Sequence, residues 1–200
     1  MSKAVLISVQ PKWCELIASG KKTVEVRKTR PRVDTPFKCY IYCTKPKKIL
    51  RYVWGKEDYA GYGEPYTQMR DDEKVFCKIP DGSSAFCSPP YSGKVIGEFV
   101  CDKIDEYARY GYAGVLPRYM KKSPGGYPAT EIHYFALQLN PADMDDYGKG
   151  KLLYGWHISD LVIYDKPKEL GEYRHRGDNY HFKPPITRPP QSWCYAEELV

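Results

Sequence analysis

A short helical pattern that is closed by glycine and followed at once by a strand pattern constrains the fold most. The run AVLISVQ (4–10) is apolar and rich in β-branched residues, which is typical of a buried strand. Pro11 then opens a helix, because its missing N–H is not needed in the first turn. Gly20 ends this helix in a left-handed cap, and TVEVRKT (23–29) alternates as a strand does. The chain therefore begins with strand, helix and strand.

The later strand patterns arrive singly, with loops or short helices between them. We expect strands at 37–43, 94–104 with a bulge at Gly97, 152–167 as one long strand or two with a bend, and 189–199. Helical patterns cover 131–139 and the residues from Asn140, as N-cap, to Gly148. Because helices do not follow every strand, the pattern predicts an α+β fold with a small mixed β-barrel and flanking helices.

The length of 200 residues suits a single domain over 1–200. Residues 51–92 and 108–130 are rich in turn signals and are interpreted as insertions, with a hairpin around 80–83 in the first and loop over 108–128 in the second.

The positive charge is concentrated at the start of the chain. Residues 1–51 hold thirteen Lys or Arg against three acids, a net charge of +10, so the remainder carries −4 of the overall +6. Such an asymmetry favours a polyanionic partner facing this segment. A solvated lysine-rich surface is the alternative.

Cysteine usage and hydropathy indicate the cellular setting. The number of cysteines, seven, is odd, and the sequence contains no CxxC motif. We therefore expect reduced thiols, no metal and no cofactor. Cys77 and Cys87 flank the predicted hairpin and could meet. No run approaches the roughly 20 apolar residues of a membrane helix. The first residues are too short and polar for a signal peptide, so the sequence predicts a cytoplasmic protein without membrane contact.

Three polar residues after Gly20 carry the candidate chemistry. Glu25 and Arg27 alternate on one strand and point to the same side about 7 Å apart. With Lys22 at the preceding corner, they could edge a cleft in which Glu25 accepts from a base and Arg27 binds a carbonyl or phosphate. A plain surface ion pair, contributing about 0–1 kcal/mol, is the alternative. Further candidate ligand residues are Ser8, Gln10, Lys12, Tyr40 and Tyr42.

The spacing P-x-x-x-x-I-x-x-G-x-K-x-x-E-x-R resembles the signature of the ASCH domain, in the PUA-like superfamily. Further resemblance lies in YIYCT, GKVIGEFVCDKI, YGWHISDLVIYDKP and RPPQSWCY, the last being similar to phage and bacterial members. The resemblance implies a barrel of about six strands, the family's size. It also implies a cleft beside the first helix that recognises RNA or a nucleoside, with Trp156, His157 and Trp193 as stacking candidates. His157 lies within a strand pattern, however, and is more readily interpreted as a strand residue with satisfied hydrogen bonds.

Three functions remain open from the sequence. The first is an RNA- or nucleotide-binding module that uses Lys22, Glu25 and Arg27. The second is a hydrolase, either a ribonuclease or an enzyme similar to the amidohydrolases of acylated cytidine; Lys22 matches their lysine, but Glu25 stands where their threonine nucleophile would be, and Thr23 is out of register. Catalysis is therefore disfavoured, with Lys22 and Glu25 as its only candidates. The third is a protein-interaction module using residues 52–66.

Overall fold

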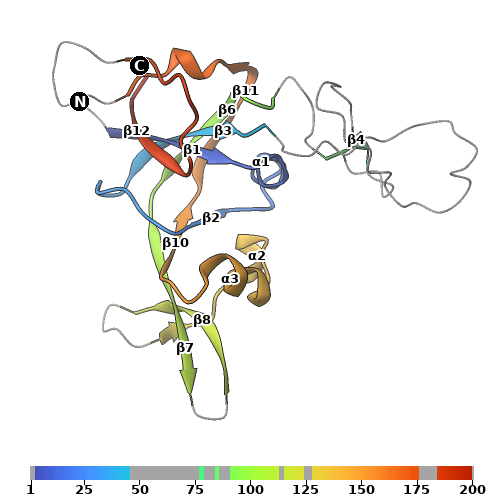
Figure 1. Cartoon of the computed structure of the whole chain (residues 1–200), viewed down its shortest axis with the longest axis vertical. Coiled ribbons are helices and arrows are strands. Elements are labelled where there is room, and N and C mark those ends of the chain that lie inside the picture. Colours follow the sequence, from blue (N-terminus) through green and yellow to red (C-terminus); the bar gives the residue numbers. More distant parts are fainter. Residues whose placement is uncertain are drawn as a thin grey trace, which may run out of the picture.

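The computed structural model describes residues 3–45, 77–78, 84–85, 91–112, 115–123, 128–175 and 184–199. It is a mixed α+β structure, as predicted (Figure 1). The elements in chain order are β1 (Lys3–Val9), α1 (Pro11–Ala18), β2 (Val24–Arg27), β3 (Phe37–Cys43), β4 (Cys77–Lys78), β5 (Ser84–Ala85), β6 (Val95–Cys101), β7 (Ile104–Tyr112), β8 (Val115–Lys122), β9 (Pro128–Thr130), α2 (Tyr134–Leu137), α3 (Pro141–Gly148), β10 (Leu153–His157), β11 (Ser159–Lys168), the 3₁₀ helix η2 (Leu170–Glu172) and β12 (Trp193–Glu197).

The first sheet, sheet A, has the strand order β11-β6-β3-β1-β12, and its central strands β1 and β3 are buried on both faces. β1 and β3 run parallel, and the other neighbours are antiparallel. Ile7 and Ile41 pack on one face with Cys14 and Ile17 of α1. The opposite face packs against the segment that contains Tyr173. This double burial explains why β1 reads as a continuous apolar run.

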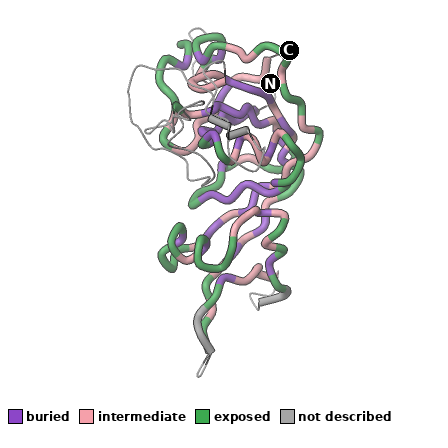
Figure 2. Tube along the Cα trace, turned by 90° about the vertical axis from the view of Figure 1, so that its right-hand side faces the viewer, coloured by how far each residue is buried: buried purple, intermediate pink, exposed green. Residues whose placement is uncertain are grey.

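The second sheet, sheet B, has the order β2-β10-β7-β8-β9. One of its faces packs against the two later helices through Leu137 of α2 and Met144 of α3. α3 begins as predicted, because Asn140 and Asp143 form a reciprocal capping box. Figure 2 shows the buried residues concentrated in sheet A and at its junction with sheet B, with more exposed backbone toward the far end of β7 and β8.

At two places the chain passes from one sheet into the other through a short bend between consecutive strands. β6 and β7 are separated by Asp102 and Lys103, and β10 and β11 are separated by Ile158. Of the two alternatives predicted for 152–167, the structure has two strands with a bend between them. Gly97 lies where β11 approaches most closely, since a Cβ there would stand 2.3 Å from the carbonyl oxygen of Val162. Register shifts in both ladders of β6 are consistent with the predicted irregularity.

The described strands do not close into the single barrel of about six strands that the sequence suggested. They form two five-stranded sheets and one two-stranded ladder, and β2 and β12 are edge strands of different sheets. The side chain of Arg27 reaches from β2 to sheet A, where it donates to the carbonyl oxygens of Ser8, on β1, and Ser192, before β12. The side chain of Arg27 thus connects β2 of sheet B with sheet A.

Two local predictions were wrong. Much of the predicted loop 108–128 is strand, because β7 continues to residue 112 and pairs with β8. Its tyrosines favour strands, and this preference outweighs the Gly and Pro signals. The predicted helix 131–139 is one turn, 134–137, because Gln138 adopts a left-handed conformation with φ of 53°.

Most of the predicted insertion 51–92 lies outside the described residues, as do residues 52–66 and Cys87. β4 and β5 pair antiparallel, with Lys78 opposite Ser84, on either side of the predicted hairpin turn at 80–83, which itself lies outside the described residues. Cys14, Cys39, Cys43 and Cys101 are buried free thiols, and Cys194 is a half-buried one. Within the described part of the chain, the helices are too short or too polar to span a bilayer.

Candidate functional site

The turn after α1 places a charged corner, which we define as Lys22, Glu25 and Arg27. Gly20 adopts φ of +73° and donates its N–H to the carbonyl oxygen of Ile17, which ends the helix. The chain then turns directly into β2. Strand alternation directs Val24 and Val26 toward the helices below sheet B and leaves Glu25 and Arg27 on the other face.

The three charged side chains meet in the interior. Glu25 lies between the two cations: its Oε2 is 3.5 Å from Nζ of Lys22, and its Oε1 is 3.1 Å from Nη2 of Arg27. The exposed fractions of Lys22, Glu25 and Arg27 are only 2%, 6% and 7%. The corner is therefore a buried ion cluster and not a surface pair.

This cluster carries an excess of positive charge and of donors. Two cations share one carboxylate, and burial lowers the pKa of Lys22 despite the opposing influence of Glu25. Neutral carbonyl oxygens take the remaining contacts: Leu137 O accepts from Lys22, and Ser8 O accepts from Arg27 at 2.7 Å. Nε of Arg27 is buried and has no partner among the described residues. The corner therefore holds two cationic side chains against one carboxylate, and one of its buried donors is unpaired among the described residues.

Trp156 is a second buried donor beside the corner. It pairs with Glu25 across the β2–β10 ladder and is fully buried, with its ring edge-to-face against Phe37 at 5.8 Å. Its Nε1 has no hydrogen-bond partner in the described part of the chain. Trp13 of α1 lies against Lys22, with its ring centroid 4.9 Å from Nζ of Lys22.

Other predicted site residues lie at different distances from the corner. Ser8 is buried next to Arg27 and donates its hydroxyl to the carbonyl oxygen of Pro190 at 2.6 Å. Gln10 is the exposed N-cap of α1, and Lys12 is exposed with its Nζ 4.4 Å from the Trp13 ring.

The structure does not bring Tyr40 or Tyr42 to the corner. Both are buried on the opposite face of sheet A, where Tyr40 packs against Tyr173. His157 bonds Asp105 through its Nε2 at 2.9 Å, which fits the interpretation of a satisfied strand residue.

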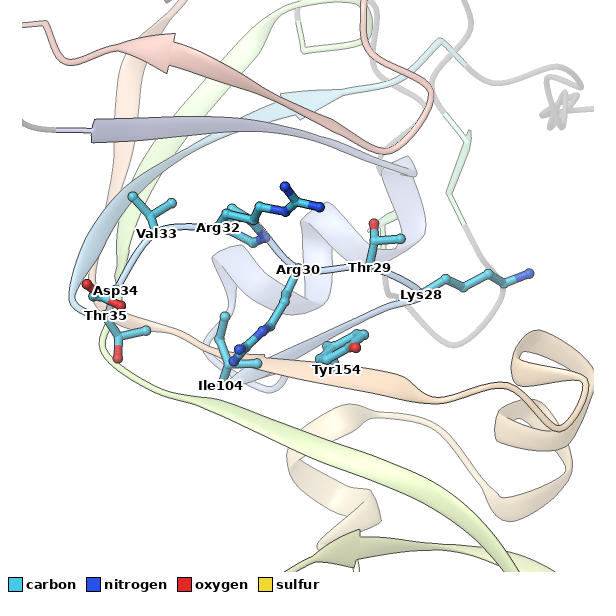
Figure 3. A pocket seen from close by; sticks show the side chains of 10 residues that line it. Lys28, Thr29, Arg30, Arg32, Val33, Asp34, Thr35, Ile104 and Tyr154 are labelled. Carbon is cyan, nitrogen blue, oxygen red and sulfur yellow. The ribbon is translucent and has the colours of Figure 1, made fainter. Parts of the chain in front are cut away.

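A groove lies beside the corner, and the sequence did not predict it as a site. Its volume is about 760 Å³, and residues 28–35, Ile104 and Tyr154 line it (Figure 3). We call this cavity the groove. Tyr154 is the cross-strand partner of Arg27, so the groove floor adjoins the corner. Alternation could have indicated Tyr154, because it lies two residues before Trp156 and therefore on the same face.

The C-terminal strand holds the groove loop in place. Trp193 donates from Nε1 to Oγ1 of Thr29 at 2.9 Å, and the N–H of Arg32 donates to the hydroxyl of Tyr195 at 2.8 Å. Trp193, a stacking candidate from the sequence, thus already packs near Trp156 and Tyr195 and orders the loop.

The candidate enzyme chemistry has a specific obstacle. Glu25 occupies the position where the amidohydrolase resemblance would place a threonine, and it is engaged by both cations. Thr23 is exposed, and its main-chain N–H is bonded to the carbonyl oxygen of Ala136. Among the described residues, His, Cys, Asp and Glu form no group that could hold a metal ion.

Comparisons with solved structures find relatives of the same fold. The crystal structure of ASCH from Zymomonas mobilis is 18% identical, with a TM-score of 0.50, over 96% of this chain and 87% of that chain. A tyrosine-to-phenylalanine mutant of that protein has a TM-score of 0.47 at 18% identity, over 96% of this chain and 89% of that chain. No curated protein sequence matches the chain.

A scan against protein families identifies the ASCH domain over residues 7–111. This match covers more than half of the 200 residues and includes the whole corner, which is where the motif resemblance was strongest. The protein therefore belongs to the ASCH domain family.

Proposed function

We propose that this protein binds RNA or a nucleotide-like ligand through the charged corner and the adjoining groove. One observation carries the proposal: two buried cations share a single carboxylate beside an open groove that contains further cations. A buried charge without a counter-ion is costly, and a phosphate would supply the missing negative charge. Arginine suits this role, because its planar fork matches phosphate oxygens.

The groove extends this chemistry to the surface. Lys28, Arg30 and Arg32 are exposed around it, against one acid, Asp34. Phosphate contacts by such residues give affinity that falls as salt displaces them. In this proposal the corner holds the anionic group, and the groove is the exposed cationic approach to it.

Fluorescence anisotropy with a labelled single-stranded RNA tests the proposal. We expect binding that weakens between 50 and 200 mM salt, as is roughly typical when several phosphates are contacted. Arg32→Ala should weaken binding about tenfold, the value of one charged hydrogen bond, and should reduce the salt slope by about 0.7. Lys166→Ala, which removes an exposed cation on β11, is the control and should leave binding unchanged. Absence of binding by the wild-type protein at low salt would refute the proposal.

A hydrolase acting on acylated cytidine, or a ribonuclease, is the second candidate. The lowered pKa of Lys22, caused first by burial, favours it, because a less basic lysine beside a carboxylate can move protons. Incubation with acylated cytidine and with short RNA, followed by product analysis, separates catalysis from binding. Turnover that Lys22→Met abolishes, in a variant that remains folded, would favour the enzyme.

The third candidate, a protein-interaction module using residues 52–66, concerns a segment outside the described residues and stays a prediction. Titration with a protein partner that binds while RNA does not would favour it.

A further inference from the structure

We propose that the groove binds a single-stranded nucleic acid by stacking one unpaired base on Tyr154, with the guanidinium of Arg30 on the other side of that base. This inference rests on the proposed function and adds the mode of recognition. It assigns a base site to Tyr154 and Arg30, outside the Lys-x-x-Glu-x-Arg motif.

The floor of the groove offers an apolar and aromatic surface. Tyr154 comes from β10 and Ile104 from β7, and both are half-buried. Ile104 is the cross-strand partner of Trp156, two residues beyond Tyr154, so alternation places Ile104 and Tyr154 on the same face of sheet B. A half-buried aromatic ring that lines an open cavity can stack with any base.

Arg30 is positioned to complete this site. Figure 3 shows its side chain extending from the loop toward Ile104, beside Tyr154, whereas the side chain of Lys28 points away from them. The Arg30 side chain is exposed, and a guanidinium plane is a common stacking partner for an unpaired base. Lys28 and Arg32 flank Arg30 in the sequence and remain to contact the backbone phosphates on either side.

The size of the groove and its place in the fold favour one base of a single strand. Its volume of about 760 Å³ lies within the usual range for a small-molecule site. The bases of a duplex have their faces covered by their neighbours, so they cannot stack on a side chain at the bottom of a cavity. Because Tyr154 pairs with Arg27 across the ladder, the stacked nucleotide would also adjoin the charged corner.

A short RNA carrying one 2-aminopurine reports stacking directly, because its fluorescence is quenched when the base stacks. We expect quenching with the wild-type protein and weaker duplex binding. Tyr154→Ala should lose at least fivefold in affinity and most of the quenching, as removal of one aromatic platform does. Tyr154→Phe keeps the ring and should bind within about twofold of the wild-type protein.

Arg30→Lys separates stacking from charge. It keeps the cation, so the salt slope should stay the same, but it removes the planar group, so quenching should decrease. Phe135→Ala is the matched control, because Phe135 is an aromatic residue of α2 that is 82% exposed and does not line the groove.

The outcomes distinguish this inference from the proposed function. If single-stranded RNA binds but Tyr154→Ala and Arg30→Lys behave like the wild-type protein, the stacking site is refuted while the proposed function stands. Equal affinity for duplex and single strand refutes it in the same way. If no RNA binds at all, both proposals are refuted.

Discussion

Arg27 has charged and neutral partners in the folded chain, and together they connect three segments. Its Nη2 is 3.1 Å from Glu25 Oε1 and donates to Ser8 O, and its Nη1 donates to Ser192 O. The residue is 7% exposed, so water does not compensate for lost partners. Arg27 therefore contributes to stability as well as to the proposed ligand site.

Replacing Arg27 by alanine should lower the free energy of unfolding by about 3–5 kcal/mol, because it removes one partner of a buried ion cluster. Urea denaturation at pH 7 measures this change. Lys21→Ala, at an exposed position next to the corner, should change the free energy by less than about 0.5 kcal/mol. A similarly small effect for both variants would show that the cluster does not stabilise the fold.

The sequence predicted the corner, but it also assigned to the site residues that lie elsewhere in the fold. Lys22, Glu25 and Arg27 could be predicted because the glycine cap and the two-residue strand period fix their directions. Tyr42 could not be placed in this way, since β3 is apolar on both faces and periodicity does not tell which face meets the site.

At the scale of elements, the strands of sheet B are joined by one carboxylate. Asp105 on β7 accepts from His157 on β10 at 2.9 Å, and its Oδ2 is 2.8 Å from Nζ of Lys121 on β8. Lys103 contacts the other oxygen, at 3.2 Å. The sequence did not indicate this cluster, because β8 was interpreted as loop and contacts across a ladder depend on register.

Acid should weaken this contact in a defined direction. Burial acts to raise the pKa of Asp105, but hydrogen bonds from Lys121, His157 and Lys103 outweigh it, so the pKa in the folded state is lowered. The stabilisation is therefore present above the ordinary pKa of about 4 and is lost as pH falls through the lower pKa of the folded state. Asp105→Asn should destabilise by about 2 kcal/mol at pH 7 and by much less near pH 2, measured by urea denaturation.

Asp102→Asn is the control for this experiment, because Asp102 is exposed in the bend before β7. Its effect should stay below about 0.5 kcal/mol at both pH values. An Asp105→Asn effect that does not diminish on acidification would contradict the assignment.

At the scale of the molecule, the two ends of the sequence build one site. The groove loop follows β2, yet its hydrogen bonds to Trp193 and Tyr195 come from residues 164 and 163 positions away. The sequence predicted both the basic segment and a final strand. It could not predict their contact, since periodicity carries no information on which distant elements pair.

Trp193→Phe tests whether β12 shapes the groove. An aromatic ring remains, but the indole N–H that bonds Thr29 is lost. We expect faster hydrogen exchange of the loop amides and RNA binding weaker by roughly two- to fivefold, as for one neutral hydrogen bond. Cys194→Ala, on the alternate face of the same strand, should leave both unchanged. Unaltered exchange in Trp193→Phe would mean that the loop keeps its shape without the hydrogen bond from Trp193 to Thr29.

The attachment of the groove loop to β12 has a consequence during biosynthesis. At ordinary rates of translation, the loop leaves the ribosome roughly 10–30 s before its anchor does. Until then, the basic segment is present on the nascent chain, but the cavity beside it is not. If the groove binds RNA as proposed, selective recognition begins only after the strand at 193–197 has emerged.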